Sequence, residues 1–232
     1  MCIRDSYKSI AELSAKELRL GGLRIDPKTN IGSRITYYNN VKIRNLKNQK
    51  SEITQVKGLP KNPKLSNISW SPDQKRIALT NTTETGVELW VLELENGSVT
   101  KLTESNLNSN IGSVINWFSD SENMLVKMIS NNRRPLIDTN KIVPDGPTIS
   151  TNFGEKAQNR TYQDLLKNKF DEHNFEQLST STIYKVSIDG SVKKWMDDGM
   201  YRTISFSPNG EYVMISQILS LIHISEPTRR RH

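Results

Sequence analysis

A short unit, made of an aromatic residue, a turn of the Ser-Pro-Asp type and a β-branched strand, occurs three times in this chain. The aromatic residues of the three copies are Trp70, Trp117 and Phe206, and the turns begin at Ser71, Ser119 and Ser207. Proline presets the torsion angle of such a turn, and the Asp or Asn after it hydrogen-bonds to the backbone just beyond. Each copy therefore predicts two antiparallel strands joined by a tight turn.

The sequence between the first two copies supplies the rest of a four-stranded sheet. Strands are predicted at 68–70, 76–80, 87–92 and 99–102, and the last two are joined by Asn96-Gly97, which suits a two-residue hairpin. Four antiparallel strands in roughly 40 residues are typical of one blade of a β-propeller. The strands predicted at 183–188 and 192–195 would be the outer half of the blade that precedes the third copy.

We therefore expect an all-β fold, a partial β-propeller of about four blades with four antiparallel strands each. The second and third copies of the unit are farther apart than the first two, by an interval that predicts two blades and an insertion. Residues 35–218 would form the partial propeller, with a loop and helix insertion at about 131–178. An unrelated β-sandwich with similar turns is the alternative.

Two segments outside the strands are predicted to be helical. Ser14 and Glu17 have the spacing of a capping box, and Gly21-Gly22 would end that helix, so residues 7–34 would hold a short N-terminal helix and the segment that leads into the propeller. Residues 133–159 are rich in Pro, Asn, Thr and Gly and predict an irregular loop. A second capping box, Thr161 with Asp164, would open the inserted helix. The apolar side of that helix would carry Leu165, Leu166, Phe170, Phe175 and Leu178, either continuously or across a break near Asn168.

Both ends of the chain have the sequence of translated sequencing adapter. Residues 1–6, Met-Cys-Ile-Arg-Asp-Ser, are encoded by ATGTGTATAAGAGACAG and one further base, which resembles a transposase end. Residues 219–229 are the translation of the reverse complement of that end, continuing into adapter. We therefore expect 1–6 and 219–232 to be artefacts and 7–218 to be natural sequence, and both ends are excluded from the fold prediction. A genuine basic tail is the alternative.

Charge and composition argue against several classes of function. The chain has 32 basic and 25 acidic residues, and this excess is spread along the sequence instead of forming the basic stripe that nucleic-acid binding requires. Cys2 is the only cysteine, and His173 is the only histidine outside the two suspect ends, so neither a metal cluster nor a nucleophile–base pair is predicted. No apolar run reaches the length of a membrane-spanning helix. We expect no cofactor, no metal, no nucleic-acid partner and no membrane segment in this fragment.

Three segments outside the repeated unit are more specific. They are residues 18–30 with Ser33-Arg34, residues 84–91 (Glu-Thr-Gly-Val-Glu-Leu-Trp-Val), and residues 160–168 (Arg-Thr-Tyr-Gln-Asp-Leu-Leu-Lys-Asn) with Asp171-Glu172. They resemble the leading segment, a blade strand and the inserted helix of the glutamyl-endopeptidase-like branch of the prolyl oligopeptidase family. The third is the most specific, because propeller geometry does not require those residues. Together the matches extend from residue 9 to 216.

The resemblance implies a substrate-gating propeller portion of a serine peptidase that hydrolyses peptides or oligopeptides. Members of the family carry a carboxy-terminal α/β-hydrolase domain, in which the Ser of a Gly-x-Ser-x-Gly elbow is activated by His and Asp. That string does not occur in this chain. The fragment itself is therefore not expected to be an enzyme, and no catalytic, cofactor-binding or metal-binding residue is assigned. Peptide substrates would be partners through the missing hydrolase domain.

Two other functions fit parts of the sequence. A freestanding propeller that acts as a protein-binding scaffold would have the same turns but not the 160–168 segment. A nucleic-acid-binding protein is suggested only by the pI of about 9.4.

Propeller loops can also contribute charged side chains that contact the substrate. Arg133, Arg134 and Arg202 are residues of this kind, although an Arg that only faces solvent is the commoner case. The compartment stays open, with a periplasmic or secreted parent as one option, because the true N-terminus would be missing.

Overall fold

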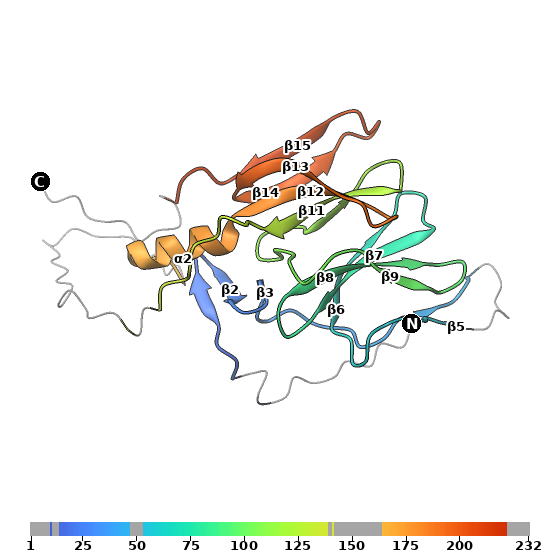
Figure 1. Ribbon diagram of the computed structural model, residues 1–232, viewed down its shortest axis with the longest axis horizontal. Coiled ribbons are helices and arrows are strands. Elements are labelled where there is room, and N and C mark those ends of the chain that lie inside the picture. Colours follow the sequence, from blue (N-terminus) through green and yellow to red (C-terminus); the bar gives the residue numbers. More distant parts are fainter. Residues whose placement is uncertain (1–9, 11–13, 47–52, 139–140, 142–163, 222–232) are drawn as a thin grey trace, which may run out of the picture.

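The computed structural model describes residues 10, 14–46, 53–138, 141 and 164–221. Two complete four-stranded antiparallel sheets form its centre, and in each of them the strands lie side by side in chain order (Figure 1). This order is that of a propeller blade. The first blade consists of β6 (Leu65–Trp70), β7 (Arg76–Thr82), β8 (Val87–Glu93) and β9 (Val99–Lys101). The second consists of β10 (Ile115–Trp117), β11 (Asn123–Ile129), β12 (Ser181–Ser187) and β13 (Val192–Gly199).

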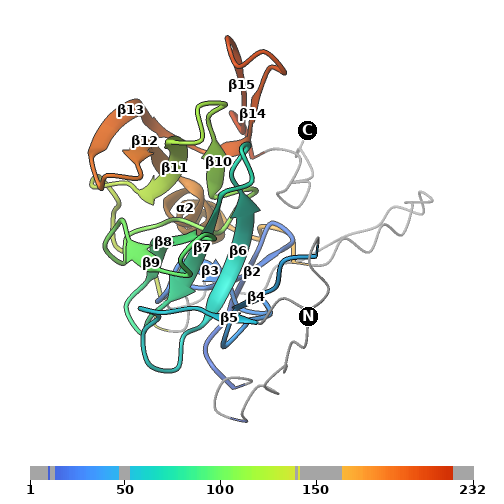
Figure 2. The same ribbon diagram turned by 90° about the vertical axis from the view of Figure 1, so that its right-hand side faces the viewer.

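A two-stranded sheet lies on either side of these two blades (Figure 2). The sheet of β4 (Lys42–Ile43) and β5 (Thr54–Gln55) packs through Val41 and Ile43 on Leu65, Leu79 and Leu92 of the first blade. On the far side, β14 (Tyr201–Phe206) and β15 (Val213–Gln217) follow the second blade. The four sheets therefore stack face to face, and the fold is a partial β-propeller.

Apolar side chains fill the spaces between successive sheets. One face of the first blade, with Ala78, Leu89 and Val91, packs on Met124 and Val126 of the second blade. The opposite face of the second blade, with Leu125 and Ile183, packs on Tyr201 and Ile204. Phe118 and Phe206, whose rings lie 4.7 Å apart, extend this second contact. Because the side chains of a strand alternate between the two faces of its sheet, each central strand serves two cores.

The repeated turns have the same hydrogen bonds in the first and third copies of the unit. Ser71 Oγ donates to Asp73 Oδ1 over 2.6 Å and accepts from the backbone N–H of Arg76 over 2.9 Å. In the third copy, Ser207 Oγ likewise donates to Asn209 Oδ1 over 2.6 Å and accepts from the N–H of Tyr212 over 3.0 Å. Asp73 and Asn209 also accept from the backbone N–H groups of Lys75 and Glu211, over 3.0 and 3.2 Å, which confirms the predicted bond to the backbone just beyond the turn.

The spacing of the blades, and the number of strands in two of them, differ from the prediction. Four sheets stack in succession, close to the expected count, but only two of them have four strands within the described ranges. The interval between the second and third copies of the unit holds one blade and not two. The reason is that β11 and β12, on either side of the insertion, pair with each other over seven residue pairs, from Asn123–Ser187 to Ile129–Ser181.

The prediction of a helix capped by Ser14 and Glu17 is wrong. The segment forms an antiparallel sheet of β1 (Leu18–Leu20), β2 (Leu23–Asp26) and β3 (Ile31–Gly32). Gly21 and Gly22, which were expected to end a helix, have φ angles of 57° and 80° and form the two-residue turn of the β1–β2 hairpin. Two successive positive φ angles are those of a type I′ turn, so the glycine pair favours the hairpin. A helical residue lies upstream, at Ile10.

The inserted helix is present, but it begins later than predicted. Helix α2 (Lys169–Ser179) starts at Asn168, whose side chain accepts from the N–H groups of Phe170 and Asp171. The predicted capping box is wrong, because Asp164 has a φ of 62° and is not helical, and Thr161 lies outside the described residues. None of the helices in the described ranges combines the length and apolar character needed to cross a membrane.

Candidate functional site

The connections between strands divide the blades into two ends. The Ser-Pro-Asp-type turns at 71–75, 118–122 and 207–212 lie at one end, because they join the first and second strands of successive sheets. The β7–β8 turn (83–86), the β9–β10 connection (102–114) and the insertion between β11 and β12 (130–180) lie at the other end, which we call the insertion face. The longest connections are therefore gathered on one face of the propeller.

The N-terminal sheet is part of this face. Ile31 of β3 forms a parallel bridge with Ser109 of the β9–β10 connection, and the Ser109 N–H donates to the Asn30 carbonyl over 2.9 Å. Leu20 and Ile25 of the hairpin are buried together with Phe175 of α2. Figure 1 shows α2 and β2 side by side at the left end of the blades. The sequence did not indicate what the inserted helix packs on; its partner is the N-terminal sheet.

Asparagine side chains fix the C-terminal end of α2 to the β9–β10 connection. Asn108 Nδ2 donates to the carbonyls of Leu178 and Thr180 over 3.0 and 2.9 Å, and Asn110 Nδ2 donates to Leu178 over 2.8 Å. These donors satisfy carbonyl groups that the end of a helix leaves unpaired. Asn174 of α2 accepts from and donates to the backbone of Ile137 over 2.8 Å in each case. The insertion is thus held to the propeller by directional contacts as well as by apolar packing.

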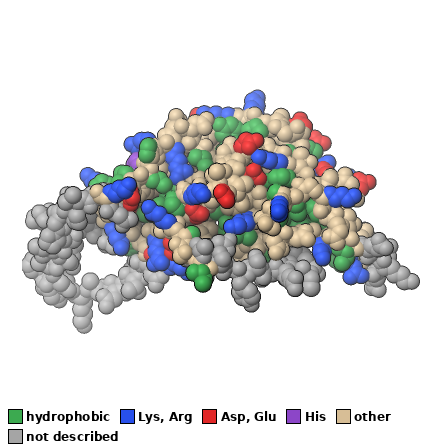
Figure 3. Space-filling view, turned by 60° about the horizontal axis from the view of Figure 1, so that its bottom comes forward, with side chains coloured by type: hydrophobic (Ala, Val, Ile, Leu, Met, Phe, Trp, Pro, Cys, Tyr) green, Lys and Arg blue, Asp and Glu red, His purple; other side chains and the backbone are tan. Residues whose placement is uncertain are grey.

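A groove of about 1390 Å³ runs between the N-terminal sheet, the 60–64 loop and the end of β7 with its turn. We call it the basic groove. Its six basic side chains are Lys16, Arg19, Lys28, Arg34, Lys61 and Lys64, and its three acidic side chains are Glu17, Asp26 and Glu84. Lys and Arg side chains are spread over the side of the molecule seen in Figure 3, with acidic groups among them. Because six basic and three acidic side chains line the groove, it has an excess of positive charge.

Of the three acidic side chains that line the groove, Glu17 has the most hydrogen-bond and ion-pair partners. It accepts from Ser33 Oγ over 2.7 Å and from Arg19 Nε over 2.9 Å, and Arg24 Nη1 and Arg34 Nε lie 3.4 and 3.7 Å from it. The Ser33 hydrogen bond, with those of its arginine neighbours, holds the pKa of Glu17 below its usual value. Glu17 therefore stays ionised and neutralises part of the arginine charge.

Two lysines of the groove are not neutralised in this way. Lys28 and Lys61 are exposed and form no ion pair with any residue in the described ranges. Asp26, the acid nearest to Lys28 in sequence, accepts from the backbone N–H of Lys28 and from the Thr29 hydroxyl. Lys64 Nζ lies 5.8 Å from the centre of the ring of Tyr37, which also lines the groove. Lys28 and Lys61 therefore contribute positive charge that no carboxylate in the described ranges offsets through an ion pair.

The end of β7 forms the floor of this groove and is held by a buried carboxylate. Glu88 accepts from Asn81 Nδ2 over 3.1 Å, from Trp90 Nε1 over 2.9 Å and from Lys101 Nζ over 3.0 Å. Burial acts to raise the pKa of Glu88, but these hydrogen bonds outweigh it, and the pKa lies below the ordinary value of 4.5. Asn81 Oδ1 in turn accepts from the Lys64 N–H over 3.0 Å, which fixes the rim of the groove.

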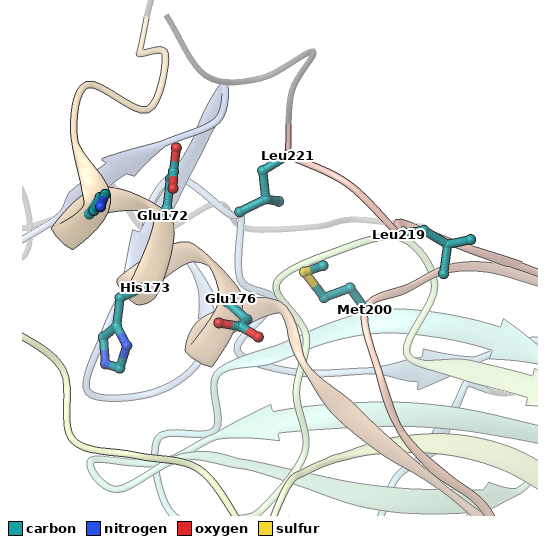
Figure 4. A pocket seen from close by; sticks show the side chains of 7 residues that line it. Glu172, His173, Glu176, Met200, Leu219 and Leu221 are labelled. Carbon is teal, nitrogen blue, oxygen red and sulfur yellow. The ribbon is translucent and has the colours of Figure 1, made fainter. Parts of the chain in front are cut away.

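A second, smaller cavity of about 390 Å³ lies beside α2 (Figure 4). Glu172, His173 and Glu176 line it together with Met200 and Leu221, and Figure 4 shows His173 pointing away from Leu221. His173 is partly exposed, and its Nε2 lies 3.0 Å from the carbonyl of Pro135. It has no serine or cysteine partner there. No group of three metal-ligating side chains occurs among the residues searched, which are those the structure describes.

The three arginines considered from the sequence have separate places. Arg133 donates to Asn30 Oδ1, and burial lowers the pKa of its guanidinium. Arg134 is exposed, with Nη2 3.6 Å from Glu176. Arg202 is an exposed residue of β14. They do not converge on one site, and Arg133 instead ties the insertion to the N-terminal sheet.

The basic groove was missed by sequence reasoning, because its walls come from residues 15–37, 60–64 and 81–84, which the fold alone brings together.

Comparison with known proteins identifies relatives over nearly the whole chain. A protein of Oryza sativa subsp. japonica named "Probable glutamyl endopeptidase, chloroplastic" is 29% identical over 227 residues, which cover 93% of this chain and 24% of the relative. The protein of the same name from Arabidopsis thaliana is 29% identical over 231 residues, with coverages of 93% and 23%. The chain thus spans about a quarter of the length of the curated relatives it matches. No protein-family model matches it.

Solved structures similar to the chain include peptidases and a TolB protein. A prolyl endopeptidase structure is 12% identical with a TM-score of 0.41 and covers 86% of this chain and 25% of that one. Pyrococcus horikoshii acylaminoacyl peptidase is 16% identical with a TM-score of 0.40, with coverages of 78% and 25%. A putative TolB from Agrobacterium tumefaciens is 15% identical with a TM-score of 0.38, with coverages of 69% and 39%. At these scores the fold assignment rests on the sheets themselves.

Proposed function

We propose that this chain, which is similar over 93% of its length to two proteins named as glutamyl endopeptidases, is the substrate-gating part of a serine peptidase of the prolyl oligopeptidase family. The parent protein would hydrolyse peptides or oligopeptides in a separate hydrolase domain. The single observation that carries the proposal is the relationship over 93% of the chain to two proteins named as glutamyl endopeptidases. The 160–168 segment favours this function over a freestanding scaffold propeller.

The mechanical part of the proposal follows from the fold. A propeller that covers an active site admits a flexible peptide and excludes a folded protein, so this gating selects substrates by their size. The stacked sheets are suited to such a cover, because their cores between successive blades make them rigid. We assign no catalytic role to the described residues, in which His173 Nε2 lies beside the Pro135 carbonyl.

We also propose that the natural protein continues beyond residue 218 into different sequence, and that residues 1–6 and 219–232 derive from adapter. Residues 7–34 would then lead into the propeller portion at 35–218. Sequencing the source gene tests this directly. Native codons for 219–232 in that gene would refute the adapter origin, whereas a downstream Gly-x-Ser-x-Gly elbow would support the peptidase assignment.

The functional test uses the complete gene product. We expect it to cleave an unstructured peptide of about ten residues and to leave a stably folded protein intact, although the same protein is cleaved after unfolding. Cleavage of the folded and unfolded forms at equal rates would contradict gating. Failure to cleave any peptide would contradict the peptidase assignment.

A further inference from the structure

The basic groove is a feature of the insertion face that the gating role does not use. Its volume of about 1390 Å³ exceeds the roughly 300–1000 Å³ of a typical small-molecule pocket. Its long walls, from the N-terminal sheet and from the 60–64 loop, leave an open channel and not an enclosed cavity. A ligand that fills it is therefore extended.

The charges of the groove select the chemistry of that ligand. Lys28 and Lys61 come from opposite walls, are exposed, and have no carboxylate partner among the residues described. On the sheet side, Glu17 neutralises part of the charge of Arg19 and Arg34, so that wall is less positive than its arginines suggest. Two lysines facing a common channel recognise carboxylates spaced along one chain, since each ammonium group acts as a point charge.

The acids of the groove decide between a peptide and a nucleic acid. Asp26 and Glu84 lie among the lysines, and they would repel a continuous line of phosphates. Tyr37 is the only aromatic side chain that lines the groove among the described residues, and it already carries Lys64 over its ring. Single-stranded nucleic acid is generally held by successive stacking platforms. A peptide with separated carboxylates avoids both difficulties.

One further observation concerns the floor of the groove. Thr82 lines it, is only 7% exposed, and its hydroxyl Oγ1 has no hydrogen-bond partner among the described residues. Buried polar atoms are normally paired. This unpaired hydroxyl belongs to a residue that lines the groove, but the oxygen itself is enclosed by protein.

We propose that the basic groove is a docking site for acidic segments of peptide substrates, separate from the active site of the hydrolase domain. The proposal rests on the proposed function, which makes peptides the substrates. An acidic segment bound by Lys28 and Lys61 holds the substrate on the insertion face and raises its local concentration. The site thereby favours peptides with several carboxylates over neutral ones of equal length.

The test measures binding without turnover. The complete gene product is treated with a fluorophosphonate to block the catalytic serine, and fluorescence anisotropy follows a labelled ten-residue peptide with alternating Glu and Ser. We expect this peptide to bind about tenfold or more tightly than the same peptide with Gln for Glu, and its affinity to fall as salt rises from 50 to 500 mM, since exposed charges are screened.

Two double variants locate the binding. Lys28→Glu with Lys61→Glu should weaken binding about tenfold or more, because each reversal replaces an attraction by a repulsion. The matched control is Lys75→Glu with Lys193→Glu, two exposed lysines outside the groove that should leave the affinity within about twofold. Circular dichroism confirms that both variants fold.

Three results would overturn the proposal. They are equal affinity for the Glu and Gln peptides, equal loss in the groove and control variants, and tighter binding of an oligothymidylate that depends on Lys28 and Lys61. The unblocked enzyme is assayed in parallel on a short neutral peptide. If it cleaves that peptide without binding the acidic one, the docking site fails and the peptidase function stands. If it cleaves nothing, the peptidase function fails, whatever the groove binds.

Discussion

The packing of α2 on the N-terminal sheet can be tested with one pair of matched substitutions. Phe175 is 2% exposed and lies against Leu20, Ile25 and Leu166, whereas Phe170 of the same helix is 36% exposed. Truncating a fully buried Phe to Ala costs about 3–5 kcal/mol through lost burial and the remaining cavity. The same change at Phe170 should cost less than about 1.5 kcal/mol, because much of the ring is already in water.

Hydrogen exchange of the complete protein reports this cost locally. Each 1.36 kcal/mol changes an opening equilibrium about tenfold, so Phe175→Ala should make the protected amides of 173–179 exchange at least about 100-fold faster. Phe170→Ala should change them by less than about tenfold. Amides of β7 and β8 in the first blade serve as the internal reference and should be unaffected by either change. Equal effects of the two substitutions on the helix would refute the docking described here.

Three further changes test other parts of the structure. Replacing Glu88 by Gln should flatten the pH dependence of stability below about pH 4.5: because the pKa of Glu88 is lower in the folded state, its contribution is fully present above the unfolded value and is lost as the pH falls through the folded one. Acid titration of unfolding that is unchanged by the substitution would contradict this. Gly86→Ala should destabilise the first blade by several kcal/mol, since the new Cβ would lie 2.1 Å from the Ser105 carbonyl oxygen. Gly190→Ala, with open space around it and a φ of 88°, should cost only about 1–2 kcal/mol for backbone strain. Similar urea midpoints for the two variants would contradict the close approach of Gly86 to Ser105. The 232-residue chain expressed alone should aggregate or unfold at modest temperature, because the edge of β15 lacks a neighbouring strand among the described residues and Tyr212 and Met214 are each 71% exposed. A monomeric chain with a sharp thermal transition would contradict that expectation.

The strands and turns of the blades were predictable because each is specified locally. The serine of the turn and the Asp or Asn that follows form the same bonds in the first and third copies. The two-residue hairpin predicted at Asn96-Gly97 is wrong: only Gly97 has a positive φ, and the Glu93 N–H donates to the Ser98 carbonyl, so the loop has four residues, 94–97. The number of complete blades was not predictable, since the 131–178 insertion lies between paired strands. Sequence intervals cannot distinguish an insertion inside a blade from an additional blade.

The N-terminal segment shows how a short polar and apolar pattern is misread. Ser14 and Glu17 fit a capping box, yet Glu17 instead binds Ser33 and Arg19 across the β1–β3 sheet. Leu18 and Leu20 alternate with period two, which is the strand pattern, and the glycine pair completes a hairpin. In this case the tertiary contact with Phe175, far away in sequence, decides the outcome.

The candidate site was beyond sequence reasoning for a similar reason. Nothing in the sequence indicated that the 60–64 loop would face residues 16–34. Only the stacking of the first blade on its neighbours and the position of the N-terminal sheet create the channel between them.

The central claim is that this chain is the non-catalytic propeller part of a serine peptidase. A fluorescent fluorophosphonate, which reacts covalently with activated serines, tests it most directly when applied to the complete gene product and to the 7–218 segment at equal concentrations. The account predicts labelling of the complete protein at a serine beyond residue 218 and no labelling of the segment. A labelled serine within 7–218, or no labelling of the complete protein at all, would contradict it.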